Sequence, residues 1–336
     1  MSEKFCIFCG KEPKNKNLEH VIPQWLIKMT GREKEDVFSL YPDAEKHIPF
    51  MRFTFPACTE CNSKYSKMEA LVKPVLERVM SGQSVTGSDI SLLMDWFDKV
   101  RVGLWLTNMY FDPKLKQDVQ PNFYIDSRVG KVDRMLSVQK LDLSGGKGIY
   151  MGGTSTPLFQ YSPTAFTMLI NDFYFFSASR HSMVMPRTGF PSLVNVKVVN
   201  PETGLFESSI AKGRNKITNP VIQSFIPNKD SVTFYQPIYG GIQNYIVDDY
   251  VLEHTYDKTK GQGGIFVQKG NTGNTKYLQP DDKIGIRLHA CKKYDLEQDA
   301  VRFQNQIHER SLTNSIDTRI GFAINNMLLK QMELQK

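Results

Sequence analysis

A stripe of apolar residues at helical spacing runs through the first third of the chain. It starts after Ser88-Asp89, a pair typical of a helix N-terminus because its side-chain oxygens can accept hydrogen bonds from free main-chain N–H groups. The apolar positions then recur every three or four residues: Ile90, Leu93, Met94, Phe97, Val100 and Leu104. We therefore predict a long helix that packs against a large apolar surface.

The stretch that begins at Cys58 has a helical pattern as well. Asn62, Tyr65 and Glu69 follow at spacings of four and three residues, which places them on one face of a helix. Pro74 has no main-chain N–H group, so we expect it to end or kink this helix.

Upstream of Cys58 the expected elements are short. A strand is predicted to end at Glu19-His20, and the apolar residues 25–27 indicate a helical turn. Residues 30–50 contain several Gly, Pro and Asp and are predicted to be a loop-like insertion, and a second short strand is predicted over residues 51–55.

Residues 113–290 are rich in short runs of β-branched and aromatic residues separated by Gly, Pro, Asn and Asp. We predict an antiparallel sheet with a buried element over residues 163–178. The helical pattern returns over about residues 296–310 and again from about Asn314. The predicted strand runs are 122–125, 132–138, 193–199, 231–235, 245–251 and 264–267.

Composition excludes several classes of protein. The chain has 336 residues, 40% of them hydrophobic, which is enough for a large core, and its formal net charge of +7 is compatible with a polyanionic partner. The apolar stretches 100–111 and 165–176 are interrupted by polar residues, so no membrane span is expected. No apolar secretory signal precedes Cys6, and a cytoplasmic protein is expected.

Four of the five cysteines form two Cys-x-x-Cys pairs. A Cys-x-x-Cys turn presents two sulfur atoms to one ion, and four thiolates make a closed tetrahedral structural zinc site. We therefore predict that zinc is bound by Cys6, Cys9, Cys58 and Cys61. Glu19-His20 lies between the pairs in sequence and is expected beside the zinc without being bound to it.

These pairs, together with Glu19-His20 and with Asn62 directly after Cys61, resemble the HNH (ββα-metal) endonuclease superfamily in its four-cysteine, zinc-bearing form. The resemblance covers residues 1–70. It implies that His20 is the general base that deprotonates water, and that Glu19 and Asn62 hold one catalytic divalent cation. Hard Mg²⁺ or Mn²⁺ prefers such oxygen ligands, and soft zinc prefers thiolates.

The chain departs from the family pattern in two respects. The family usually has Asp before the histidine, where this chain has Glu19, one methylene longer. No asparagine stands where many members carry their middle Asn, so the residue that orients His20 is unassigned. A main-chain carbonyl could take that role.

The predicted organisation is α+β: a zinc-stapled ββα-metal module over 1–70, a helical connector over 71–112, and a β-rich antiparallel domain with C-terminal helices over 113–336. Residues 113–336 are expected to have a recognition or regulatory role. Lys64 and Lys67 are candidate phosphate contacts. A lysine- and arginine-rich stretch over 176–229 is a candidate nucleic-acid surface or an ordinary solvated sheet face.

The expected function is metal-dependent hydrolysis of DNA, or of RNA, by an HNH endonuclease. An HNH region joined to a large second region also resembles bacterial restriction and anti-phage nucleases. Two alternatives remain: a catalytically inactive, zinc-dependent nucleic-acid-binding protein, and an adaptor whose residues 113–336 sense a ligand or protein. A homodimer through the amphipathic C-terminal helix is a further option.

Overall fold

A computed structural model describes most of the chain. The described residues are 5–13, 15, 17–41, 44–111, 124–128, 133–143, 146, 148–179, 192–200, 205–211, 230–238, 253–257, 259, 261–270, 275–291, 296–309 and 316–334.

The N-terminal region is a pair of strands followed by a long helix. β1 (Asn17–His20) pairs antiparallel with β4 (Thr54–Ala57), and α2 (Thr59–Met80) begins directly after Cys58. Side chains alternate along β1, so that Leu18 is 59% exposed while Glu19 is 5% exposed. The order of strand, strand and helix confirms the predicted local fold, although β4 begins at Thr54 rather than Met51.

The prediction of a loop over residues 30–50 is wrong. After α1 (Gln24–Met29), the chain forms an antiparallel hairpin of β2 (Asp36–Tyr41) and β3 (Ala44–Pro49), and then the 3-10 turn η1 (Phe50–Arg52). Asp36 and Pro49, two of the residues that indicated a loop, lie opposite each other at the ends of these strands, where they do not interrupt the pairing, and residues 42–43 lie outside the described part of the chain.

Helix α2 does not end at Pro74, one of the two predicted effects of this proline, because it continues to Met80; a kink at Pro74 stays a prediction. Pro74 and Ala70 are both exposed, so water can reach the main-chain carbonyl of Ala70 that lacks a partner. After β5 (Ser84–Thr86) comes α3 (Gly87–Phe111), whose predicted apolar stripe is buried.

The centre of the molecule is an eight-stranded sheet with the strand order β16-β15-β12-β6-β9-β8-β7, to which β18 adds by parallel pairing with β6. The other pairings within it are antiparallel. The strands are β6 (Arg134–Leu141), β7 (Ile149–Gly152), β8 (Ala165–Ile170), β9 (Phe173–Ser179), β12 (Val232–Gln236), β15 (Ile265–Lys269), β16 (Lys276–Leu278) and β18 (Ala290–Cys291).

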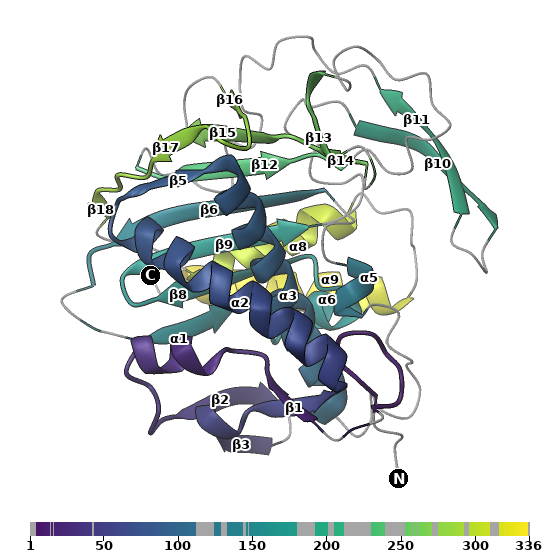
Figure 1. Cartoon of the computed structure of the whole chain (residues 1–336). Coiled ribbons are helices and arrows are strands. Elements are labelled where there is room, and N and C mark those ends of the chain that lie inside the picture. The colour runs from purple at the N-terminus through teal and green to yellow at the C-terminus, as the bar shows by residue number, and fades with distance from the viewer. Residues whose placement is uncertain are drawn as a thin grey trace.

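Helices cover both faces of this sheet (Figure 1). Leu136 and Val138 of β6 belong to the apolar core shared with α2 and α3, and Met135 belongs to the opposite core with Phe303 and Ile307 of α8. The period of two along a strand divides the side chains between the two cores. The remaining elements are α5 (Ile125–Arg128), α6 (Pro157–Tyr161), α8 (Leu296–Glu309), α9 (Ile316–Leu334), β10 (Ser192–Asn200), β11 (Leu205–Ala211), β13 (Thr255–Asp257), β14 (Gln262–Gly263) and β17 (Lys283–Gly285).

The α+β prediction is confirmed, with one local difference at Ile125. The buried element over residues 163–178 is the hairpin of β8 and β9, and the C-terminal helices are α8 and α9. Ile125 begins α5 instead of ending a strand. Residues 122–123 and 245–251 lie outside the described part of the chain. Among the described residues no helix is long and apolar enough to cross a membrane.

The larger apolar core continues from the cysteine-bearing segment through α2 and α3 to the sheet. Gly103 of α3 permits the close approach of the N-terminal region, because a Cβ atom there would lie 2.8 Å from Val21 Cγ1. The boundaries 1–70, 71–112 and 113–336 stay predictions.

Candidate metal centre and neighbouring catalytic residues

The four predicted cysteine ligands lie together at the start of α2. Their sulfur atoms are all within 4.8 Å of one another, and Cys58 Sγ is 3.8 Å from Cys9 Sγ and 3.5 Å from Cys6 Sγ. Zinc bound by four thiolates at about 2.3 Å places the sulfur atoms about 3.8 Å apart. The cluster therefore fits a structural metal ion such as zinc.

The backbone around Cys6 and Cys9 is shaped for this cluster. Gly10 has a φ of +77°, and a Cβ atom there would lie 2.3 Å from the ring of Tyr124. Only glycine adopts this left-handed conformation at low cost, and only glycine leaves room for that ring. The chain therefore turns sharply after Cys9, and the main-chain N–H of Gly10 donates to the Cys6 carbonyl oxygen at 2.8 Å.

The thiols of the cluster differ in acidity. Burial raises the pKa of Cys6 to about 11 and also raises that of Cys61. Burial would raise the pKa of Cys58 too, but hydrogen bonds from Cys61 and the other thiols outweigh it and lower that pKa. A metal ion replaces the protons of all four groups when it binds.

The sequence pattern gave no indication of Asp126, which lies against this centre. Its main-chain N–H donates to the carbonyl oxygen of Phe8 at 2.9 Å, and its carboxylate accepts hydrogen bonds from Tyr65 Oη and from Lys64 Nζ, the latter at 2.8 Å. Cys61 Sγ is 4.0 Å from the same carboxylate. Asp126 thus connects α5 to the cysteine cluster, and no spacing rule predicts such a contact.

His20 is half-buried at the end of β1, with its imidazole held by the main chain. Its Nε2 atom is 3.1 Å from the carbonyl oxygen of Met51 in η1. A carbonyl oxygen only accepts, so Nε2 carries the proton and Nδ1 has the free lone pair. The side-chain amide nitrogen of Gln24, Nε2, lies 3.3 Å from the same ring nitrogen.

Asn62 lies in the first turn of α2 and reaches back to β1. Its Nδ2 donates to the carbonyl oxygen of Leu18 at 3.3 Å, and its Oδ1 accepts from Ser66 Oγ at 3.2 Å. Asn62 is half-exposed. The side-chain amide is therefore next to the strand that carries Glu19 and His20, and among the described residues its oxygen accepts a hydrogen bond from the exposed Ser66 hydroxyl.

Glu19 has a partner that the sequence did not predict. Lys99 Nζ of α3, 0% exposed, lies 2.6 Å from Glu19 Oε1 and also forms an ion pair with Glu69 of α2. Burial alone would lower the pKa of Lys99, but the two carboxylates together outweigh it and raise that pKa. The carboxylate proposed for a divalent cation thus binds an ammonium group.

The predicted phosphate contacts have different surroundings. Lys64 is exposed but forms an ion pair with Asp126, whereas exposed Lys67 forms no ion pair with a described residue. Within the basic stretch 176–229, residues 180–191, 201–204 and 212–229 lie outside the described part of the chain. A phosphate group would have to displace Asp126 from Lys64, but it would displace no described ion-pair partner from Lys67.

No protein-family model matches the chain, and no match was found among curated proteins or solved structures.

Proposed function

We propose that this chain is a metal-dependent endonuclease of the HNH type that hydrolyses phosphodiester bonds of DNA. The observation that carries the proposal is His20, which ends β1 with its imidazole bound by a main-chain carbonyl, in a hairpin whose second strand leads directly into Cys58 of the four-cysteine cluster. A role in bacterial restriction or anti-phage defence is part of the proposal, on the resemblance stated above.

His20 is the proposed general base. With Nε2–H donating to the Met51 carbonyl, the ring is fixed in one tautomer and Nδ1 can take a proton from water. General base catalysis by a positioned imidazole contributes about 10²–10⁴-fold in rate. The carbonyl supplies the orienting contact for which the sequence offers no asparagine.

Asn62 and Glu19 are the proposed donors for one Mg²⁺ or Mn²⁺ ion. Asn62 fits this role, because it is half-exposed and its oxygen has only Ser66 as a partner among the described residues. Glu19 fits in part, because Lys99 already binds Oε1 and a cation would have to share the carboxylate with that lysine. The cation would supply positive charge to the phosphoryl oxygens and the leaving oxygen.

The test is cleavage of supercoiled plasmid by zinc-loaded protein in EDTA, Mg²⁺ and Mn²⁺. We expect cleavage that requires added metal and that disappears in His20→Ala. Met51 binds His20 through its main chain, so Met51→Leu should keep the contact and is the matched control. Cleavage by His20→Ala at the wild-type rate would contradict the mechanism.

A second candidate is a zinc-dependent nucleic-acid-binding protein without catalysis. The observation in its favour is the ion pair of Lys99 with Glu19, because this carboxylate then stabilises the fold instead of holding a catalytic cation. This candidate predicts salt-dependent binding of DNA or RNA, with no turnover under any metal condition.

A further inference from the structure

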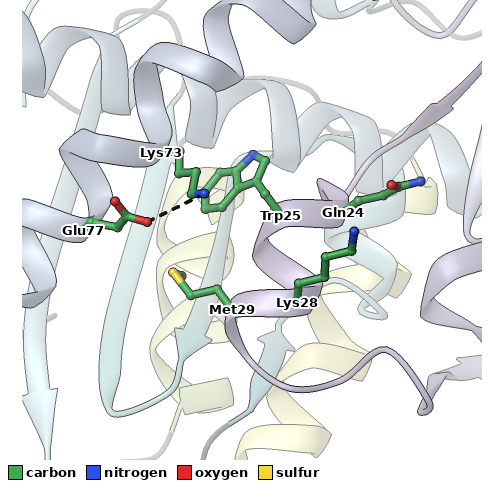
Figure 2. Close-up of a pocket in the computed structure, with 6 residues that line it drawn as sticks. All are labelled: Gln24, Trp25, Lys28, Met29, Lys73 and Glu77. Carbon is green, nitrogen blue, oxygen red and sulfur yellow. Dashed lines mark ion pairs between the residues drawn. The ribbon is translucent and has the colours of Figure 1, made fainter.

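An open pocket of about 650 Å³ lies between α1 and α2 (Figure 2). It is lined by Gln24, Trp25, Lys28, Met29, Lys73 and Glu77. We propose that this pocket binds one nucleotide unit of a nucleic-acid strand, with the phosphate on Lys28 and Lys73 and the base against Trp25. The inference rests on the proposed function, for which it supplies a substrate-binding site.

Two exposed lysines from different helices provide the positive charge. Lys28 comes from the last turn of α1 and forms no ion pair with a described residue. Lys73 comes from α2, and its Nζ is 4.0 Å from Glu77 Oε1, with both side chains about half exposed. An exposed ion pair at that distance is weak, so a phosphate group can compete for Lys73.

Trp25 provides an aromatic wall. The indole is half-buried and packs near Trp96, with ring centroids 6.0 Å apart, so its position is fixed by the core. Figure 2 shows the ring between Lys28 on one side and the pair of Lys73 and Glu77 on the other. Bases of any sequence stack on an aromatic ring, because every base has a π-face.

Gln24 connects the pocket to the proposed catalytic base. The same residue lines the pocket and lies 3.3 Å from His20 Nε2. A strand with one nucleotide in the pocket would therefore pass directly to His20. A pocket that did not adjoin His20 could not place a neighbouring phosphodiester bond at the proposed base.

The test measures binding separately from cleavage. The probe is a fluorescein-labelled oligothymidylate of about 12 nucleotides, within the length that one single-strand site covers. Its anisotropy is followed with zinc-loaded His20→Ala protein in citrate without added divalent metal, so that no hydrolysis occurs. We expect Lys28→Gln with Lys73→Gln to weaken binding about tenfold and to reduce the salt slope by about 0.7, for one lost phosphate contact.

Two matched variants sharpen the result. Glu77→Gln removes the competing carboxylate and should tighten binding about twofold to fivefold, opposite in sign to the lysine variants. Lys276→Gln with Lys283→Gln removes two exposed charges from β16 and β17, which Figure 1 places far from α1, and should leave affinity almost unchanged. Equal effects of the two double-lysine variants would overturn the proposal.

Two further readouts address the base and the source of the nucleotide. Tryptophan fluorescence should be quenched by the oligonucleotide, and Trp25→Phe should lose most of that quenching. Displacement of the probe by thymidine monophosphate at lower concentrations than by unlabelled oligonucleotide would overturn a strand as the occupant. If the lysine variants weaken binding but no variant or metal condition gives cleavage, the pocket stands and the proposed nuclease fails.

Discussion

The N-terminal region, up to the end of α2, and the eight-stranded sheet are stabilised in different ways. The hairpin of β1 and β4 has four residues in each strand, and it depends on a cysteine cluster and on α3 packed behind it. The sheet is covered by helices on both faces, and its core with α8 contains no residue from the N-terminal region. Candidate chemistry lies in the region that packs on the sheet through the larger apolar core, which it shares with α3.

The two regions also differ in the balance of buried charges along helix α3. Towards the sheet, Arg101 and Arg134 face Asp98 and Asp95, which gives two positive and two negative groups. Towards β1, Lys99 alone faces two carboxylates. The first cluster is electrically balanced, whereas the second keeps an excess negative charge beside the candidate site. An excess of this kind attracts a cation or a proton.

Removal of the metal should have the largest effect and should separate the two regions. Binding of structural zinc contributes about 10–16 kcal/mol in small zinc modules, so a strong chelator is expected to unfold the hairpin and the cysteine loops. Hydrogen exchange should then show lost protection in β1, β4 and the start of α2, with protection retained in β6, β8 and β9. Loss of protection in both regions together would contradict this division.

The Lys99→Met substitution should have the next largest effect. It leaves Glu19 and Glu69 buried without their cation, and breaking a buried ion pair in this way costs about 3–5 kcal/mol. Arg134→Met is the matched comparison, and it should cost less because Asp98 keeps Arg101 as a partner. Urea unfolding at neutral pH measures both.

Acidity should affect the N-terminal cluster through Glu69. Burial raises the pKa of Glu69, against the attraction of Lys99, above the usual value of 4.5. A raised pKa in the folded state stabilises the protein below pH 4.5, and this stabilisation is lost as pH rises through the raised pKa. The difference in unfolding free energy between wild type and Glu69→Gln should therefore change over that window, by up to about 1 kcal/mol. A pH-independent difference would contradict the assignment.

The smallest effect on stability is expected for the proposed catalytic groups themselves. His20 and Asn62 are half-exposed, so His20→Ala and Asn62→Ala should each change the unfolding free energy by less than about 1 kcal/mol. Both should nevertheless abolish or strongly reduce cleavage of plasmid. A large loss of stability would instead indicate that His20 and Asn62 have a structural role.

Much of the local structure followed from the sequence because it depends on neighbouring residues. The Cys-x-x-Cys spacing predicted a cluster that the structure confirms, and helical periodicity predicted α3 with its buried stripe. Pro74 misled the prediction for α2, since the cost of proline depends on whether solvent can reach the freed carbonyl. The Pro and Asp residues over 30–50 also led to a wrong prediction, that of a loop, because strand ends and loops have a similar composition.

The sequence by itself determined which groups are available: four thiols at metal spacing, an imidazole after a carboxylate, and an asparagine after the last cysteine. Only the tertiary structure decided their partners. Lys99 is 80 residues from Glu19, and the Met51 carbonyl that orients His20 is a main-chain group with no sequence signature. Contacts between distant segments depend on how helices and strands pack, and this packing is a property of the whole chain.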